Sequence, residues 1–140
     1  MNISEVSKKL NISPKTLRYY EQEKLIPAVR RNQNGYRDYT EYDINWIYFV
    51  KQMRRAGVSI KAISKYTALF LKDRDGTIDQ RKQILLEQQQ KMQEKIRKIQ
   101  EALNFLNHKI DIYDDKFKFA EDKLDPYIQQ HLDNRKDDEF

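Results

Sequence analysis

Apolar residues near the start of the chain recur at the spacing of short amphipathic helices. Ile3, Val6 and Leu10 lie three or four positions apart, which predicts a first helix. Ser13 followed by Pro14 is a favourable helix start, because serine caps free backbone N–H groups and proline lacks one. The pattern therefore predicts two helices joined by residues 11–13, as in a helix-turn-helix.

The second predicted helix carries cationic and aromatic side chains that suit nucleic acid. Leu17 and one tyrosine can face inward, which leaves Lys15, Thr16 and Arg18 as candidates for base contacts. The other candidates are expected to contact phosphates or to support the interface. The full predicted DNA-binding set is Ser13, Lys15, Thr16, Arg18, Tyr19, Tyr20, Arg30, Arg31, Tyr36, Arg37 and Tyr39.

Residues 28–39 predict a basic two-stranded wing. Asn34-Gly35 is a hairpin-turn dipeptide, and Val29, Tyr36 and Tyr39 supply strand propensity on either side. We expect the wing to contact phosphates beside the second helix; the alternative is a solvated basic loop.

Two further helices follow. Thr40, with Asp43 three positions on, predicts the start of a helix that ends near Gly57, and Ser59 caps another that runs to about Phe70. Arg54 and Arg55 either add phosphate contacts or offset the dipole of the third helix. The aromatic residues Trp46, Tyr48 and Phe49 are expected in the core, and the alternative is a small ligand pocket.

After a polar hinge at residues 73–76, apolar residues repeat every seven positions in two rows. A helix from residue 77 to about 118 would span roughly 60 Å, too long for a domain of 72 residues to bury alone. We therefore expect a homodimer with a coiled coil over residues 77–120, parallel or antiparallel. The predicted seam is Ile78, Leu85, Met92, Ile96, Ile99, Leu103, Leu106, Ile110, Tyr113 and Phe117.

The rest of the chain, residues 121–140, is a short tail. A short amphipathic helix near 125–132 is predicted there, with disorder at the end.

Charge is unevenly divided along the chain. Residues 1–72 hold 14 Lys and Arg against 6 Asp and Glu, a net charge of +8, whereas residues 73–140 carry −3. A basic segment joined to an interaction element favours a nucleic-acid-binding protein. We expect a cytoplasmic protein, because the sequence has neither a transmembrane segment nor a signal peptide.

Other chemistry is poorly represented. The chain has no cysteine, so thiolate metal sites and thiol catalysis are excluded. His108 and Asp111 could share a helix face around a metal, but solvated surface residues are the favoured interpretation. There is no phosphate-binding glycine loop and no cluster of histidines with acids, so we expect no enzyme, no catalytic residues, no metal and no cofactor.

An ordered series of motifs resembles the DNA-binding domain of the MerR family of bacterial transcription regulators. They are Ile3-Ser4-Glu5-Val6, residues 16–21 (TLRYYE), Leu25-Ile26-Pro27, residues 35–39 (GYRDY), Asp43-Ile44 with Ile47, and residues 54–60 (RRAGVSI). The resemblance implies a winged helix-turn-helix over residues 1–72 and an antiparallel dimer coil. It further implies that the dimer binds a palindromic operator in a promoter spacer, and that it distorts the DNA to help bacterial RNA polymerase.

The resemblance leaves the inducing signal open. The chain looks similar to a short subgroup linked to aldehyde and electrophile stress, but Gln52 stands where those sensors have a cysteine. A small-molecule effector, the target genes and the balance of activation and repression are therefore not predicted. The rival functions are a sequence-tolerant architectural or recombination-accessory DNA-binding protein and a coiled-coil interaction protein; the basic charge of residues 1–72 argues against the second.

Overall fold

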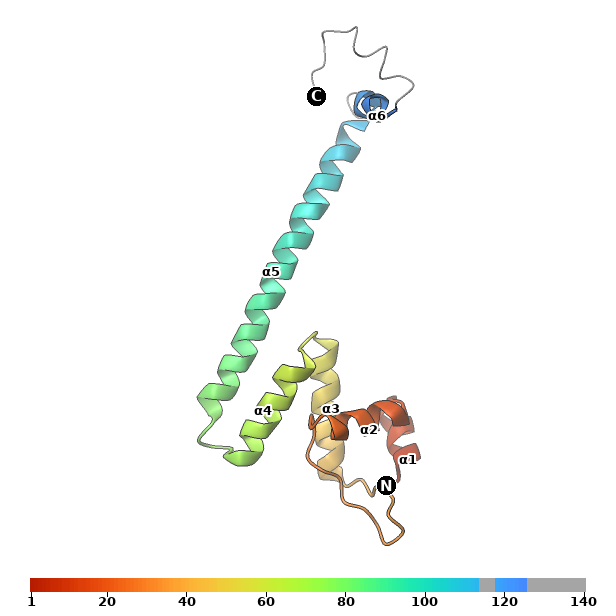
Figure 1. The fold of residues 1–140 in the computed structure, drawn as a ribbon, viewed down its shortest axis with the longest axis vertical. Helices are drawn as coiled ribbons and strands as arrows, with labels where there is room; N and C mark the ends of the chain where they lie inside the picture. Colours follow the sequence, from red (N-terminus) through yellow and green to blue (C-terminus); the bar gives the residue numbers. More distant parts are fainter. Residues whose placement is uncertain (114–117, 126–140) are drawn as a thin grey trace. The chain divides into compact units, whose positions relative to one another are not determined.

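A computed structural model describes residues 1–113 and 118–125 of the chain. These residues are mainly helical, which confirms the predicted fold class. The chain divides into two compact units, residues 1–92 and 93–140. The helices in chain order are α1 (Ile3–Leu10), α2 (Pro14–Gln22), α3 (Glu41–Arg55), α4 (Ile60–Lys72), α5 (Ile78–Asp111) and α6 (Lys118–Leu124) (Figure 1).

The predicted helix starts are confirmed in atomic detail. The hydroxyl of Ser13 accepts a hydrogen bond from the N–H of Thr16 at 3.1 Å. Thr40 and Asp43 form a reciprocal capping box at the start of α3, and Ser59 accepts from the N–H of Ala62 at 3.1 Å. Each cap satisfies a backbone donor that the helix itself cannot pair, so local sequence defines where α2, α3 and α4 begin.

The core of the N-terminal unit joins α1–α4 with the first turns of α5. Leu17, Leu25, Ile47 and Ile63 are fully buried in it. The Thr67 hydroxyl of α4 donates a buried hydrogen bond of 2.7 Å to the carbonyl of Leu25, which ties α4 to the segment after α2. This packing holds α2 in a fixed position on the surface of the unit.

The start of α5 packs on its own N-terminal unit through Ile84 and Gln88, which the seven-residue repeat did not indicate, and through Met92, which the repeat placed in the dimer seam. Ile84 is buried in the core, and Met92 packs against it. The buried Gln88 side chain accepts a hydrogen bond of 3.2 Å from the N–H of Ser59, at the start of α4. One face of these turns is therefore occupied within the chain.

The wing is a hairpin with a single bridged pair, Arg31 and Arg37, where two strands were predicted. Asp38 N–H donates to the Arg30 carbonyl at 2.8 Å beside that bridge. The Asn32 side chain accepts from the N–H groups of both Asn34 and Tyr36, which makes a wide turn in place of a tight two-residue one. The pairing is short because the turn takes up the residues next to the bridge.

The long helix is shorter than predicted. α5 has 34 residues and ends at Asp111, whereas the repeat predicted a helix to about residue 118. At ~1.5 Å per residue it is about 51 Å long. Phe117 of the predicted seam lies outside the described residues. The same holds for the helix predicted near 125–132, of which only Asp125 is described. None of the helices within residues 1–113 and 118–125 has the length and apolar character needed to cross a membrane.

Candidate nucleic-acid interface

A basic concavity forms where α2, the hairpin and the start of α1 meet. It has a volume of about 460 Å³, and none of the described residues lining it is acidic. Three of the predicted cations gather here, Arg18 from α2 and Arg31 and Arg37 from the hairpin. Tyr36, which is 70% exposed, stands at its edge. Asn2 and Ser4 also line it, although neither was among the predicted residues.

An ion pair fixes the hairpin against α2. Arg37 donates through Nε to a Glu21 carboxylate oxygen at 2.6 Å, and both side chains are largely buried. The other oxygen of Glu21 accepts from the N–H of Val29 at 2.9 Å. Glu21 thus holds the hairpin at two points, and the sequence marked this residue only as part of a family motif.

Arg31 has a second structural contact. Its Nη1 donates to the carbonyl of Gly35 at 3.0 Å, across the turn of the hairpin. A guanidinium carries five N–H donors, so both Arg31 and Arg37 retain donors beyond these contacts for a phosphate.

A second concavity of about 380 Å³ surrounds the N-terminus of α2. The predicted residues Ser13, Thr16 and Tyr20 line it together with cations of α3. Lys51 donates to the Leu10 carbonyl at 2.6 Å and Arg54 to the Val58 carbonyl at 2.7 Å. Arg55 also lines this concavity, so α3 adds positive charge beside the start of α2. Lys51 was missed because its position in a helical pattern does not show which neighbouring helix it meets.

The remaining predicted contacts divide by exposure. Lys15, Tyr19 and Arg30 are exposed, outside the described linings of both concavities. Tyr20 and Tyr39 are buried, and burial raises the pKa of both phenols above the ordinary value. Tyr39 is only 2% exposed, and its hydroxyl has no hydrogen-bond partner among the described residues. Tyr39 therefore belongs to the core, whereas Tyr20 is buried but also lines the second concavity.

The predicted seam of α5 is largely exposed in the single chain. Ile96, Ile99 and Ile110 are each about two-thirds exposed, and Leu103 is 46% exposed. Met92 is the exception, since it packs against the core of its own N-terminal unit. Arg97 forms ion pairs with Glu94 and Glu101. Among the described residues no set of three or more metal-ligating side chains gathers, around His108 or elsewhere.

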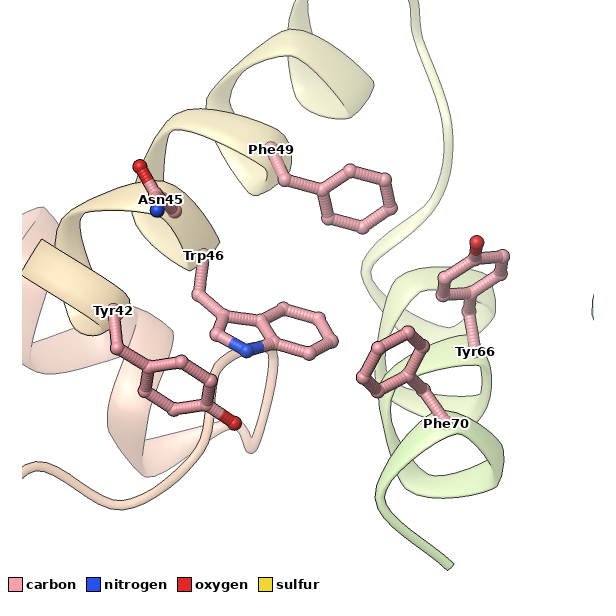
Figure 2. A pocket seen from close by; sticks show the side chains of 6 residues that line it. All are labelled: Tyr42, Asn45, Trp46, Phe49, Tyr66 and Phe70. Carbon is pink, nitrogen blue, oxygen red and sulfur yellow. The ribbon is translucent and has the colours of Figure 1, made fainter. Parts of the chain in front are cut away.

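An aromatic cavity lies between α3 and α4. We use this name for the hollow lined by Tyr42, Asn45, Trp46, Phe49, Tyr66 and Phe70 (Figure 2). Of the aromatic residues that the sequence singled out, Trp46 and Phe49 line it. The expectation that Tyr48 lies in the core is wrong, because its side chain is exposed elsewhere on α3. Trp46 packs against the core as well, so it fits both interpretations considered from the sequence.

Two family models match the chain. One, described as MerR HTH family regulatory protein, matches residues 1–69, and the other, described as MerR, DNA binding, matches residues 44–109. The chain is 49% identical to the HTH-type transcriptional regulator AdhR of Bacillus subtilis over 92 residues, which are 66% of this chain and 65% of AdhR. It is 34% identical to CueR of Salmonella typhi over 85 residues, 61% of this chain and 62% of CueR. The matches thus span less than two-thirds of these curated relatives.

Solved structures extend the similarity over most of the chain. A MerR family transcriptional regulator from Listeria monocytogenes is 40% identical, with a TM-score of 0.70, and the match covers 94% of this chain and 98% of that one. HiNmlR, a MerR family regulator lacking the sensor domain and bound to promoter DNA, is 26% identical with a TM-score of 0.62; 85% of this chain and 94% of HiNmlR are covered. The sequence and the fold agree, and this chain belongs to the MerR family of helix-turn-helix transcription regulators.

Proposed function

We propose that this protein is a homodimeric regulator that binds a palindromic promoter operator through α2 and the hairpin. The observation that carries the proposal is the basic concavity, which gathers Arg18, Arg31 and Arg37 from separate segments. Convergent guanidinium groups with no carboxylate among the described lining residues suit a phosphate of duplex DNA. Membership of a family of transcription regulators, rather than of enzymes, agrees with this interpretation.

The arrangement supports two kinds of DNA contact, one to the phosphate backbone and one to base edges. Arg31, Arg37 and the neighbouring Tyr36 would contact the DNA backbone, as would Arg30. Lys15, Thr16 and Arg18 lie on α2, the second helix of the helix-turn-helix, and would reach base edges in the major groove. Ser13 and Tyr19 complete the contact surface. In this proposal residues 1–72 bind DNA, residues 73–76 form the hinge, and residues 77–120 form the dimer.

Exposed apolar residues along α5 support the homodimer. Side chains such as Ile96, Ile99 and Ile110 are costly to leave in water, and a second copy of the same helix would cover them. The family resemblance favours antiparallel pairing. Two copies of α2 related by a two-fold axis would match a palindromic operator.

Regulation through DNA shape is the proposed mechanism. HiNmlR was solved bound to promoter DNA. This similarity supports the proposal that the present protein also binds a promoter. Bending and untwisting a promoter spacer costs a few kcal/mol, on the order of what a set of phosphate contacts can supply. We infer that the dimer uses its contacts to distort the spacer for RNA polymerase in the cytoplasm.

A pair of single substitutions tests the interface. Arg18→Ala should weaken operator binding by about tenfold or more and relax the base preference at one operator position, because a contact to a base edge is lost. Lys65→Ala is the matched control, since it removes the same charge from α4, where Lys65 lines a separate hollow with Leu69 and Ile84. Fluorescence anisotropy on the operator duplex, and on duplexes that differ from it by single base pairs, gives both quantities. Equal losses for the two variants would remove Arg18 from the interface.

The dimer is tested separately by sedimentation equilibrium. Leu103→Lys places a charge in the seam and should shift the protein to monomer. His108→Lys, an exposed position on the other side of α5, should leave the dimer intact. A Leu103→Lys variant that remains dimeric would refute the seam.

The operator itself can be found by recovering genomic fragments bound by the purified protein. A shared palindrome inside promoter spacers is the expected result. Scattered sites without a common sequence would contradict promoter distortion and favour an architectural or recombination-accessory role.

A further inference from the structure

The aromatic cavity has the dimensions and lining of a small-molecule site. Its volume is about 320 Å³, at the lower end of the range usual for ligand pockets. Five of its six lining residues are aromatic, and the rings of Trp46 and Phe49 on α3 face those of Tyr66 and Phe70 on α4 (Figure 2). No part of the DNA-binding proposal uses this cavity.

The rings around the cavity contact one another, and those of Trp46 do so edge to face. Trp46 makes such contacts with Phe49, at 5.8 Å between ring centroids, and with Phe70, at 5.1 Å. Phe49 and Tyr66 are tilted by 33° at 5.3 Å. These rings present both edges and faces to the opening, so a flat aromatic ligand can continue the same packing.

Charge beside the cavity disfavours a cationic ligand. Aromatic cages often bind cations, but here arginine side chains of the chain itself already lie over the aromatic rings that line the cavity. The Arg81 guanidinium lies 5.4 Å from the ring centre of Tyr66 and 5.1 Å from that of Phe70. Arg74 lies 5.8 Å from the Phe70 ring centre. No carboxylate is among the described residues that line the cavity, so the electrostatic environment favours an anion.

Hydrogen-bond donors at the cavity point to the same kind of ligand. The indole nitrogen of Trp46 and the hydroxyl of Tyr42 lie on the same side of the ring group (Figure 2). An indole N–H can only donate, and a phenol can donate as well as accept. Together they are suited to hold an acceptor such as a carboxylate.

We propose that the aromatic cavity binds a planar aromatic carboxylate as an effector. The aryl group packs on the exposed edges and faces of the rings where α3 meets α4, and the carboxylate accepts from Trp46 and Tyr42. Bound there, the ligand fixes α4 against α3 within the unit that carries α2, which gives it a route to the DNA-binding surface. The site needs no cysteine, in keeping with a chain that has none.

The binding test uses the full-length protein and 2-naphthoate as the probe. Trp46 is the only tryptophan of the chain, so its emission reports directly on the cavity, and calorimetry gives the affinity independently. We expect saturable binding with a Kd on the order of 0.1 to 1 mM, as suits a small fragment in an open site. The cation 2-naphthylmethylammonium should bind at least about fivefold more weakly, because of the adjacent arginines.

Matched variants locate the site. Tyr42 and Tyr48 both lie on α3 and are similarly exposed, at 54% and 55%, but only Tyr42 lines the cavity. Tyr42→Ala should weaken naphthoate binding by about threefold to tenfold, and Tyr48→Ala should leave it unchanged. Tyr42→Phe should show part of the loss, which isolates the hydroxyl.

Three results would overturn the proposal. One is a lack of saturable binding to the full-length protein, and another is an equal effect of the Tyr42→Ala and Tyr48→Ala substitutions. The third is Trp46 emission that acrylamide quenches only after the protein is diluted to monomer. That result would mean that a second copy of the chain occupies the cavity in the dimer. None of these results bears on DNA binding by Arg18.

Discussion

Removing Glu21 should destabilise the N-terminal unit more than its partly exposed position in α2 suggests. One carboxylate oxygen accepts from the N–H of Val29, a buried residue, and the other pairs with Arg37. Leaving a buried N–H without an acceptor costs about 1 to 3 kcal/mol. Losing a partly buried ion pair adds about 1 kcal/mol, given that Glu21 and Arg37 are 16% and 21% exposed. Glu21→Ala should therefore lower the free energy of unfolding by about 2 to 4 kcal/mol.

Glu21→Gln separates the two contributions. The amide oxygen of glutamine can still accept from Val29, so only the charge of the pair is lost, and the expected cost is about 1 kcal/mol. Urea denaturation followed by Trp46 emission measures both variants, at a single protein concentration because unfolding of a dimer depends on concentration. Arg37→Ala, alone and combined with Glu21→Gln, completes a double-mutant cycle for the pair.

Refutation would come from the order of the two effects. If alanine and glutamine at position 21 cost the same, the bond to Val29 contributes nothing measurable. If both cost less than about 0.5 kcal/mol, the hairpin is held by other contacts and Glu21 is an ordinary surface residue.

Two further substitutions test buried groups and backbone strain. Tyr39→Phe removes a buried hydroxyl without a partner among the described residues, so stability should stay equal or rise by about 1 kcal/mol, measured by urea denaturation. Because burial raises the pKa of Tyr39 in the folded state, wild-type stability should fall as pH rises above about 10, where unfolded tyrosine ionises, and Tyr39→Phe should show a smaller fall. Gly57→Ala should cost about 1 to 2 kcal/mol in the same assay, since Gly57 has a φ of +89°; an unchanged midpoint would contradict the strain.

The sequence predicted the parts of the fold that depend on local chemistry. Ser13, Thr40 and Ser59 mark helix starts because a cap bonds to an N–H only three residues away. Gly57 marks a helix end because few other residues accept its backbone angles. Such signals need no knowledge of the tertiary structure.

The sequence did not predict which side chains face inward in irregular segments. Tyr39 and Tyr36 look alike in a basic aromatic stretch, yet Tyr39 is buried and Tyr36 is 70% exposed. The difference arises because the hairpin folds back on the unit, where Glu21 holds both Val29 and Arg37. Residue type and spacing do not reveal that distant contact. The sequence alone therefore could not show which aromatic candidates for DNA contact are buried and which are exposed.

The first turns of α5 show how one helix can follow two patterns at once. The seven-residue repeat indicated a seam through Leu85, and Leu85 is indeed exposed, as a dimer contact requires. Ile84 and Gln88, which lie outside the seven-residue repeat, face the N-terminal unit instead, and Gln88 accepts a hydrogen bond from the start of α4. A buried glutamine needs hydrogen-bond partners, and Gln88 has one in the N–H of Ser59. The same turns of α5 therefore pack on their own unit and leave a face for the proposed dimer, so a change in helix pairing could reach the DNA-binding surface through α4.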